Sequence, residues 1–181
     1  MNPSATVARA LEAERDDVEA AVLPVDYERL GDVLAPLLAP ARQAVILLGV
    51  AIGRSAVSLE RVAINFRDGA RPDNAGFVPE RPEIVPGGPA AYFSTLPIEA
   101  ARDRIAAAGV PVEISLSAGA YLCNAAFYLA RHALDARDTP CGFVHLPPTP
   151  DLACGATPMR FADQVRAVGE LIGSSIRRDG P

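Results

Sequence analysis

The chain has 181 residues and a mean hydropathy of +0.17, which suits one domain with a packed core. Its formal net charge of -5 offers no basic surface to a phosphate backbone, which argues against nucleic-acid binding. The longest apolar run, at 44–52, is far shorter than the ~20 residues that cross a bilayer, so we expect no membrane-spanning segment.

The chain start and the cysteines predict a cellular compartment. The first residues have neither the basic region nor the apolar region of a secretory signal. The three cysteines are an odd number without paired spacing, which suits a reducing environment. We therefore expect a cytoplasmic protein.

The predicted elements begin with a helix. Asn2 is a typical N-cap and Pro3 suits the first helical position, so a helix is predicted to about Glu14. A short strand is predicted at 18–23, and a second helix from Tyr27 to about Pro40. The apolar run at 44–49, AVILLG, is typical of a strand buried on both faces in a parallel sheet.

The rest of the chain continues this alternation. A strand is predicted at 59–66, followed at 67–88 by a loop of a length that is usually functional or disordered. The later predictions are a helix at 97–108, a strand at 110–116, a helix at 122–136, a strand at 142–146 and a helix at 158–176.

The alternation predicts a three-layer α/β/α sandwich with a mostly parallel, twisted sheet, as a single domain over 1–181. Alternating folds usually open with a buried strand, whereas this sequence opens with a helix. We therefore expect that a first strand is missing from it.

Two reactive side chains follow predicted strands. Cys123 comes after the strand at 110–116 through a turn of small residues and opens a helix, whose N-terminal N–H groups would stabilise a thiolate and lower its pKa. His145 closes the strand at 142–146, so both side chains are expected at one edge of the sheet. His132 lies about half a turn out of phase with Cys123 on the same helix, which leaves His145 as the available base.

Each residue also has a structural interpretation. A cysteine in an apolar helix is more often a small buried hydrophobe, and a histidine that closes a strand is more often a satisfied core residue. Glu60, beside Arg61, would ordinarily be a solvated charge or a member of an ion pair. Cys141 and Cys154 are interpreted as structural, and the absence of C-x-x-C spacing argues against a zinc site.

Three motifs favour the catalytic interpretation. They are SAGAYLCN at 117–124, GFVHLP at 142–147 and LERVAIN at 59–65. With RPDN at 71–74 and GGPAAY at 87–92, they occur in an order and spacing that resembles the type I pyroglutamyl peptidases, also called pyrrolidone-carboxylate peptidases. The resemblance extends from Asn2 to about Leu152.

The resemblance implies a cysteine exopeptidase that removes an N-terminal pyroglutamate from peptides without a cofactor or metal. At the matching positions it implies Cys123 as nucleophile, His145 as base and Glu60 as the residue that orients the imidazole. Members of this family are often dimers or tetramers, which implies a homodimer or homotetramer.

The resemblance also implies residues that bind the substrate. Tyr121 and Leu122 match positions that line the pyroglutamate pocket, although core packing explains Leu122 equally well. Arg71 matches an arginine near the Pro-Asp-Asn motif, but here it directly precedes Pro72, so its role stays open.

The sequence departs from the family pattern in several places. Family members usually open with a strand and a turn resembling GFxPFGG before the segment that is Asn2-Pro3-Ser4 here. Val50 replaces a common pocket glutamine, and Pro148 replaces a usual tyrosine. Two alternatives therefore stay open: a catalytically impaired relative that acts as a binding or structural module, and a cysteine amidase for another small acyl group.

Overall fold

The computed structural model describes residues 2–69, 71–152 and 157–176. Within these residues a four-stranded sheet has the order β1-β6-β2-β5, and β3 and β4 form a separate antiparallel pair. The strands are β1 (Val45–Val50), β2 (Val57–Glu60), β3 (Val62–Ile64), β4 (Ala91–Phe93), β5 (Val112–Ser115) and β6 (Cys141–Leu146). The helices are α1 (Pro3–Glu14), α2 (Tyr27–Leu38), α3 (Ile98–Ala107), α4 (Leu122–Leu134), the 3-10 turn η1 (Pro150–Leu152) and α5 (Phe161–Ser175).

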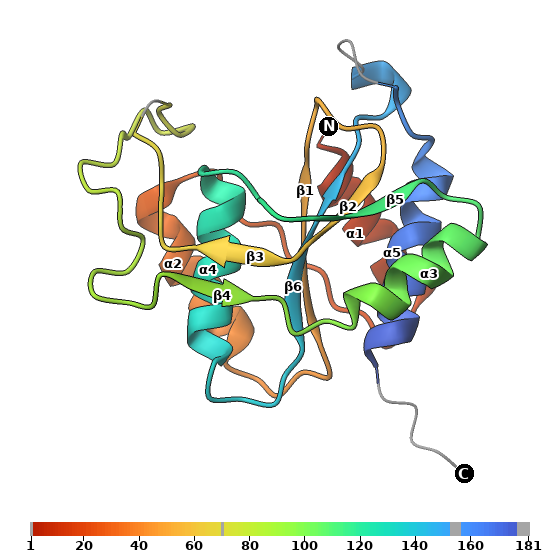
Figure 1. Cartoon of the computed structure of the whole chain (residues 1–181), viewed down its shortest axis with the longest axis horizontal. Helices are drawn as coiled ribbons and strands as arrows, with labels where there is room; N and C mark the ends of the chain where they lie inside the picture. The colour runs from red at the N-terminus through yellow and green to blue at the C-terminus, as the bar shows by residue number, and fades with distance from the viewer. Residues whose placement is uncertain (1, 70, 153–156, 177–181) are drawn as a thin grey trace.

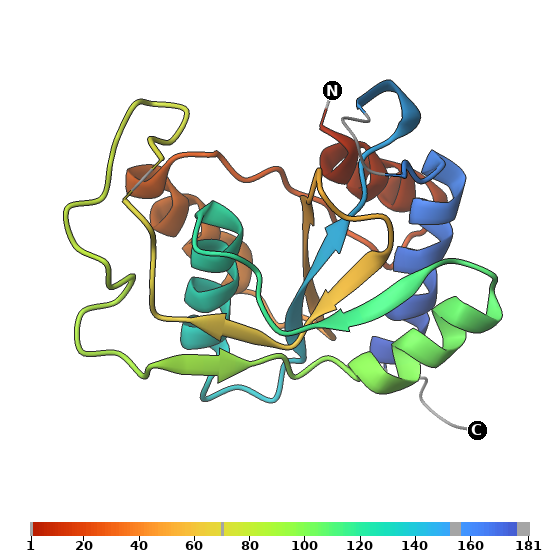
Figure 2. The ribbon, with the colours of Figure 1, turned by 45° about the horizontal axis from the view of Figure 1, so that its top comes forward.

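Helices cover both faces of the central sheet. In Figures 1 and 2, α1, α3 and α5 lie on one side of the sheet, and α2 and α4 lie on the other, with the β3–β4 pair alongside α4. Each side has its own apolar core. The predicted three-layer α/β/α architecture is confirmed. None of the described helices has the length and apolar character needed to cross a membrane.

The sheet consists of two parallel pairs that run in opposite directions. β1 pairs parallel with β6, and β2 pairs parallel with β5, but β2 and β6 are antiparallel. Two of the three pairings are therefore parallel. Because β5 and β6 run in opposite directions, their carboxyl ends lie at opposite ends of the strands of the sheet. The expectation that Cys123 and His145 meet because both follow the carboxyl ends of strands was therefore wrong.

Alternation along the strands assigns each side chain to one face. On β6, Phe143 packs into the core under α2 and α4, whereas Val144 packs into the core under α1, α3 and α5. His145 therefore shares the face of Phe143. On β2, Leu59 packs toward the α1, α3 and α5 side, so Glu60 faces α4.

Some predicted elements are confirmed and others are not. α1 ends at Glu14 as predicted, and the Asn2 side chain accepts a hydrogen bond from the Ser4 backbone N–H at 3.1 Å. The strand predicted at 18–23 was wrong. Side chains of α1 bind its backbone instead, since Ala20 donates its N–H to Glu12 Oε1 at 2.9 Å.

The strand predicted at 59–66 is divided between two sheets. Its first part belongs to β2 and its second part to β3, with Arg61 between them. The partner of β3 is β4, a three-residue strand that was not predicted from the sequence. This division sends the chain from the central sheet out along α4, where the pair lies in Figure 1.

Candidate active site

Two adjacent rows of paired residues cross the α4 side of the sheet. The first row contains Gly49 on β1, His145 on β6, Ser58 on β2 and Glu113 on β5. The second row contains Leu47, Phe143, Glu60 and Ser115. Glu60 is thus the diagonal neighbour of His145 on the adjacent strand, a separation that long side chains can span.

The imidazole and the carboxylate meet across these rows. His145 Nδ1 lies 2.7 Å from Glu60 Oε1, and both residues are buried, Glu60 completely. A carboxylate accepts hydrogen bonds, so the Nδ1–H donates and Nε2 is left as an acceptor. The Phe143 ring, with its centroid 4.8 Å from that of His145, packs against the imidazole.

Helix α4 brings the thiol to the same place. The turn at 116–121 returns the chain from the end of β5 to the face of the sheet, and α4 begins at Leu122. A Cβ placed on Gly49 would lie 3.0 Å from Cys123 Sγ, so the sulfur rests directly on the strand position that pairs with His145. Only glycine at position 49 leaves this space.

Asn124 anchors the start of α4. Its amide accepts a hydrogen bond from the Ile64 N–H at 3.0 Å and donates to the carbonyls of Ile64 and Phe66 at 2.9 and 2.8 Å. Asn124 is completely buried, so these bonds fix the residue next to Cys123 to β3. Because the predicted strand at 59–66 is divided, Ile64 and Phe66 lie beside α4, where their backbone groups bond the Asn124 amide.

Arg54 joins the site from the connection between β1 and β2. Its Nη1 donates to Glu60 Oε1 at 2.7 Å and its Nη2 to the Ser117 carbonyl at 2.9 Å. Arg54 was not predicted from the sequence as a site residue, and Glu60 was given the alternative interpretation of a solvated charge or a member of an ion pair. Arg61, the next residue, lies between β2 and β3 and forms its ion pair with Glu99.

The thiol of Cys123 is half-buried, and this determines its ionisation. Burial, and then the negative charge of Glu60, raise the pKa of Cys123 to about 11, while its own backbone N–H lowers it by less. The expectation that the helix N-terminus makes the pKa low was wrong. At neutral pH the sulfur is a thiol, so a thiolate requires a base that takes its proton.

The residues expected to bind substrate lie around the start of α4. Tyr121 is half-buried and its hydroxyl donates to the Pro72 carbonyl at 3.0 Å, which ties the 67–88 loop to the residue before α4. Leu122 is buried in the core, and Arg71 is exposed on the same loop. His132 points away as predicted: it is exposed, and its Nδ1 bonds the Tyr92 hydroxyl at 2.8 Å.

The remaining cysteines lie apart from this cluster. Cys141 is completely buried in the core, where desolvation raises its pKa to about 12. Cys154 falls outside the described residues. Within the part of the chain that is described, no group of three histidine, cysteine or acidic side chains could hold a metal ion.

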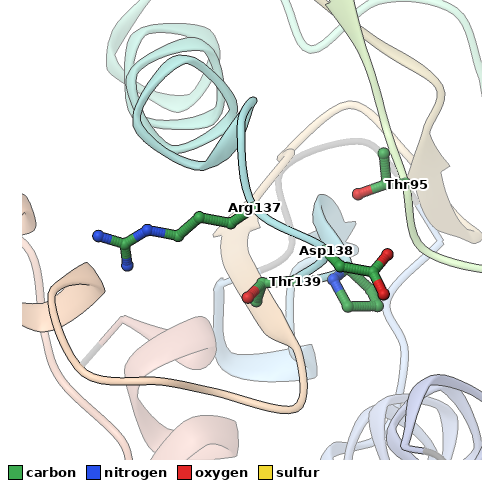
Figure 3. Close-up of a pocket in the computed structure, with 5 residues that line it drawn as sticks. Thr95, Arg137, Asp138 and Thr139 are labelled. Atoms are coloured by element: carbon green, nitrogen blue, oxygen red, sulfur yellow. The ribbon is translucent and has the colours of Figure 1, made fainter.

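A cavity of about 100 Å³ lies at the opposite end of β6. Thr95 and residues 137–140 line it. Figure 3 shows Arg137 extending away from it, and the Arg137 Nη1 donates to the Leu38 carbonyl at 2.7 Å. Because His145 is at the other end of β6, this cavity is separate from the Cys123 cluster.

Comparison with known proteins identifies related sequences. A sequence model described as pyroglutamyl peptidase matches residues 1–176. The pyrrolidone-carboxylate peptidase of Clavibacter michiganensis is 42% identical over 159 residues, which cover 85% of this chain and 75% of that protein. The protein of the same name from Pseudomonas fluorescens is 40% identical over 174 residues, which cover 93% of this chain and 82% of that protein.

Solved structures give a similar result. A mutant pyrrolidone carboxyl peptidase from Pyrococcus furiosus superposes with a TM-score of 0.88 at 34% identity, covering 97% of this chain and 90% of that one. The enzyme from Thermus thermophilus has a TM-score of 0.86 at 42% identity, covering 97% of this chain and 93% of that one.

Proposed function

This chain belongs to the pyroglutamyl peptidase family, and we propose that it hydrolyses the amide bond that follows an N-terminal pyroglutamate. In this proposal Cys123 is the nucleophile, His145 the general base and Glu60 the residue that orients the imidazole. The substrates are peptides with an N-terminal pyroglutamate. A cytoplasmic location and a homodimer or homotetramer stay predictions.

One observation carries the proposal: three chemically complementary side chains converge on one face of the sheet. Glu60 Oε1 lies 2.7 Å from His145 Nδ1, and the Cys123 sulfur rests on Gly49, the direct strand partner of His145. A thiol, an imidazole and a carboxylate in this order can transfer a proton and attack a carbonyl.

The reaction begins with proton transfer, because the pKa of Cys123 is about 11. His145 Nε2 takes the thiol proton as the sulfur attacks the pyroglutamyl carbonyl carbon, and Glu60 stabilises the imidazolium. The tetrahedral intermediate then breaks its C–N bond, and His145 returns the proton to the leaving amine. In this proposal the first N–H groups of α4 stabilise the oxyanion.

Hydrolysis of the resulting thioester completes the cycle. His145 takes a proton from a water molecule as the water oxygen attacks the thioester carbonyl carbon. The C–S bond breaks, pyroglutamic acid leaves, and the proton returns to the Cys123 sulfur. These steps use no metal or cofactor.

We further propose that the start of α4 and the 67–88 loop form the pyroglutamate pocket. The hydrogen bond from Tyr121 to the Pro72 carbonyl supports this, because it places the loop beside the nucleophile. Pyroglutamate is a compact neutral lactam, which suits apolar walls such as Tyr121 and Leu122. Arg71 would act from the loop, at the mouth of the pocket.

The test is release of a fluorogenic amine from a pyroglutamyl amide, compared between this chain and its Cys123→Ala variant. Turnover by the chain and none by Cys123→Ala supports the proposal. Equal rates would refute the catalytic role of Cys123. Acetyl and prolyl amides of the same amine, run in parallel, test the alternative of an amidase for another small acyl group.

A further inference from the structure

We propose that Arg54 is a positioning residue of the proposed reaction, which holds the Glu60 carboxylate against His145 and ties it to the turn that carries Cys123. This inference depends on the proposed function for its meaning. The contacts of Arg54 with the buried carboxylate and the turn can nevertheless be tested without measuring turnover.

Arg54 links the Glu60 carboxylate, six residues further along the chain, to Ser117, which is 63 residues away. It lies between β1 and β2, its Nη1 donates to Glu60 Oε1 at 2.7 Å, and its Nη2 donates to the Ser117 carbonyl at 2.9 Å. Ser117 belongs to the turn that leads into α4, six residues before Cys123. Because the guanidinium is planar, these two bonds fix the carboxylate and the turn relative to each other.

The charge of Glu60 makes this contact important. The Glu60 side chain is completely buried, and within the described residues its Oε2 has no hydrogen-bond partner. Arg54 and His145 thus converge on Oε1, which carries the contacts that stabilise the negative charge. A buried carboxylate that loses its cation is strongly destabilised. The Arg54 side chain is only 27% exposed, so solvent screens the pair weakly.

Arg54 also sets the charge that His145 experiences. Among the described residues, the charged and titratable groups around the imidazole on this side of the sheet are Glu60 from β2, Glu113 in the same row on β5, Cys123 from α4 and Arg54 from the β1–β2 connection. Arg54 supplies positive charge among two acids and a thiol. Its removal leaves more negative charge near the ring, which favours the protonated imidazole up to a higher pH.

The experiment compares Arg54→Gln, Arg54→Lys and Arg61→Gln with the parent chain. Arg61 is the matched control, because it makes the same kind of ion pair, with Glu99, but on the surface. The first measurement is the titration of the histidine side-chain ¹⁵N signals by NMR. The chain has two histidines, and His132, which faces away from the site, is an internal reference.

We expect Arg54→Gln to move the protonation of His145 to higher pH by about one unit and to leave His132 unchanged. The acidic limb of the kcat/KM profile should move in the same direction, and kcat/KM at pH 7 should fall about 10- to 100-fold, mainly through kcat. In Arg54→Lys the acidic limb of the kcat/KM profile should stay at the pH of the parent, because the substitution keeps the positive charge. This variant should lose about 3- to 10-fold in kcat/KM, because an ammonium group cannot reproduce the bond to Ser117.

Unchanged His145 signals in folded Arg54→Gln, together with kcat/KM within about twofold of the parent, would overturn the proposal. If Arg54→Gln does not fold, Arg54→Lys decides: parental kcat/KM, or a displaced His145 titration, overturns it. A parent chain without turnover would instead refute the proposed function, while the NMR titration would still decide the role of Arg54. Arg61→Gln should match the parent in both measurements.

Discussion

The two faces of the central sheet differ in what they bury. Toward α1, α3 and α5, the strands present an apolar core that includes Val57, Leu59 and Val144. Toward α4, the same strands present Glu60 and His145 beside the aromatic core. One face of the sheet therefore contributes stability alone, and the other also carries the proposed chemistry.

This difference follows from single-residue alternation. Glu60 follows Leu59 and His145 follows Val144, so each polar residue faces α4 while its neighbour faces the opposite helices. Substitutions of adjacent residues should therefore have separable effects, on turnover for one face and on unfolding for the other.

The largest expected effect is that of His145→Ala. Without the imidazole no group takes the proton of the Cys123 thiol, so kcat/KM for a pyroglutamyl amide should fall by about 1000-fold or more. His132→Ala, on the outer surface of α4, should stay within about threefold of the parent. Comparable losses of kcat/KM in both variants would show that the loss does not depend on the His145 imidazole in particular.

The same His145→Ala variant reports the ionisation of Cys123. The pKa of the thiol is raised to about 11 by burial, so the sulfur is protonated at pH 7 and ionises only as the pH approaches that value. Alkylation of Cys123 by iodoacetamide, followed by mass spectrometry, should accelerate about tenfold per pH unit from pH 7 to 9.5. A rate that levels off by about pH 9.5, as expected for an unperturbed thiol with a pKa of about 8.5, would contradict the raised pKa.

A smaller effect on turnover is expected for Gly49→Ala. The added Cβ would lie 2.8 Å from Phe143 Cζ and 3.0 Å from Cys123 Sγ, so the ring and the sulfur must both move. We expect kcat/KM to fall about 10- to 100-fold, since a displacement near 1 Å has this effect. Overpacking should also reduce the free energy of unfolding by about 1 to 3 kcal/mol.

Gly31→Ala is the matched control for this substitution. Gly31 lies inside α2, and no atom is within 4 Å of a Cβ added there. Turnover should be unchanged, and the free energy of unfolding should rise by about 0.5 to 1 kcal/mol through helix propensity. If Gly49→Ala left turnover unchanged and raised the free energy of unfolding in the same way, this would contradict the close contact between the Cys123 thiol and Gly49 on β1.

The order and limits of most elements could be predicted from the sequence. α1, β1, α4 and β6 are encoded by local signals such as the Asn2 cap and continuous apolar runs. The segment at 18–23 was mistaken for a strand because apolar spacing cannot reveal that the Glu12 side chain binds its backbone. The short strand β4 has too few residues for a periodic pattern.

The candidate site could be predicted only in part. Cys123, His145 and Glu60 were identified by residue type and motif, but the direction of the strands was not, because pairing of β2 with β6 is a long-range property. Arg54 was missed because an arginine in a short connection has no distinctive pattern. The raised pKa of Cys123 depends on burial by neighbours distant in sequence.

Among the substitutions next to the site residues, the smallest effect on turnover is expected for Leu59→Ala, on the face away from α4. Leu59 is completely buried, so truncation leaves a cavity that should lower the free energy of unfolding by about 2 to 5 kcal/mol, measured by denaturant titration. The kcat/KM of the folded protein should stay within about threefold of the parent. Val22→Ala, at a position 57% exposed, is the control and should change stability by less than about 0.5 kcal/mol.

This substitution decides whether the two faces are independent. Leu59 directly precedes Glu60, so any shift of the β2 backbone would move the carboxylate away from His145. A tenfold loss of kcat/KM at conditions where the variant is fully folded would mean that packing on one face sets the geometry of the other. Parental kcat/KM with reduced stability would mean that the ladder to β5 and β6 holds β2 in register, so that Glu60 keeps its place although the core behind it has lost a side chain.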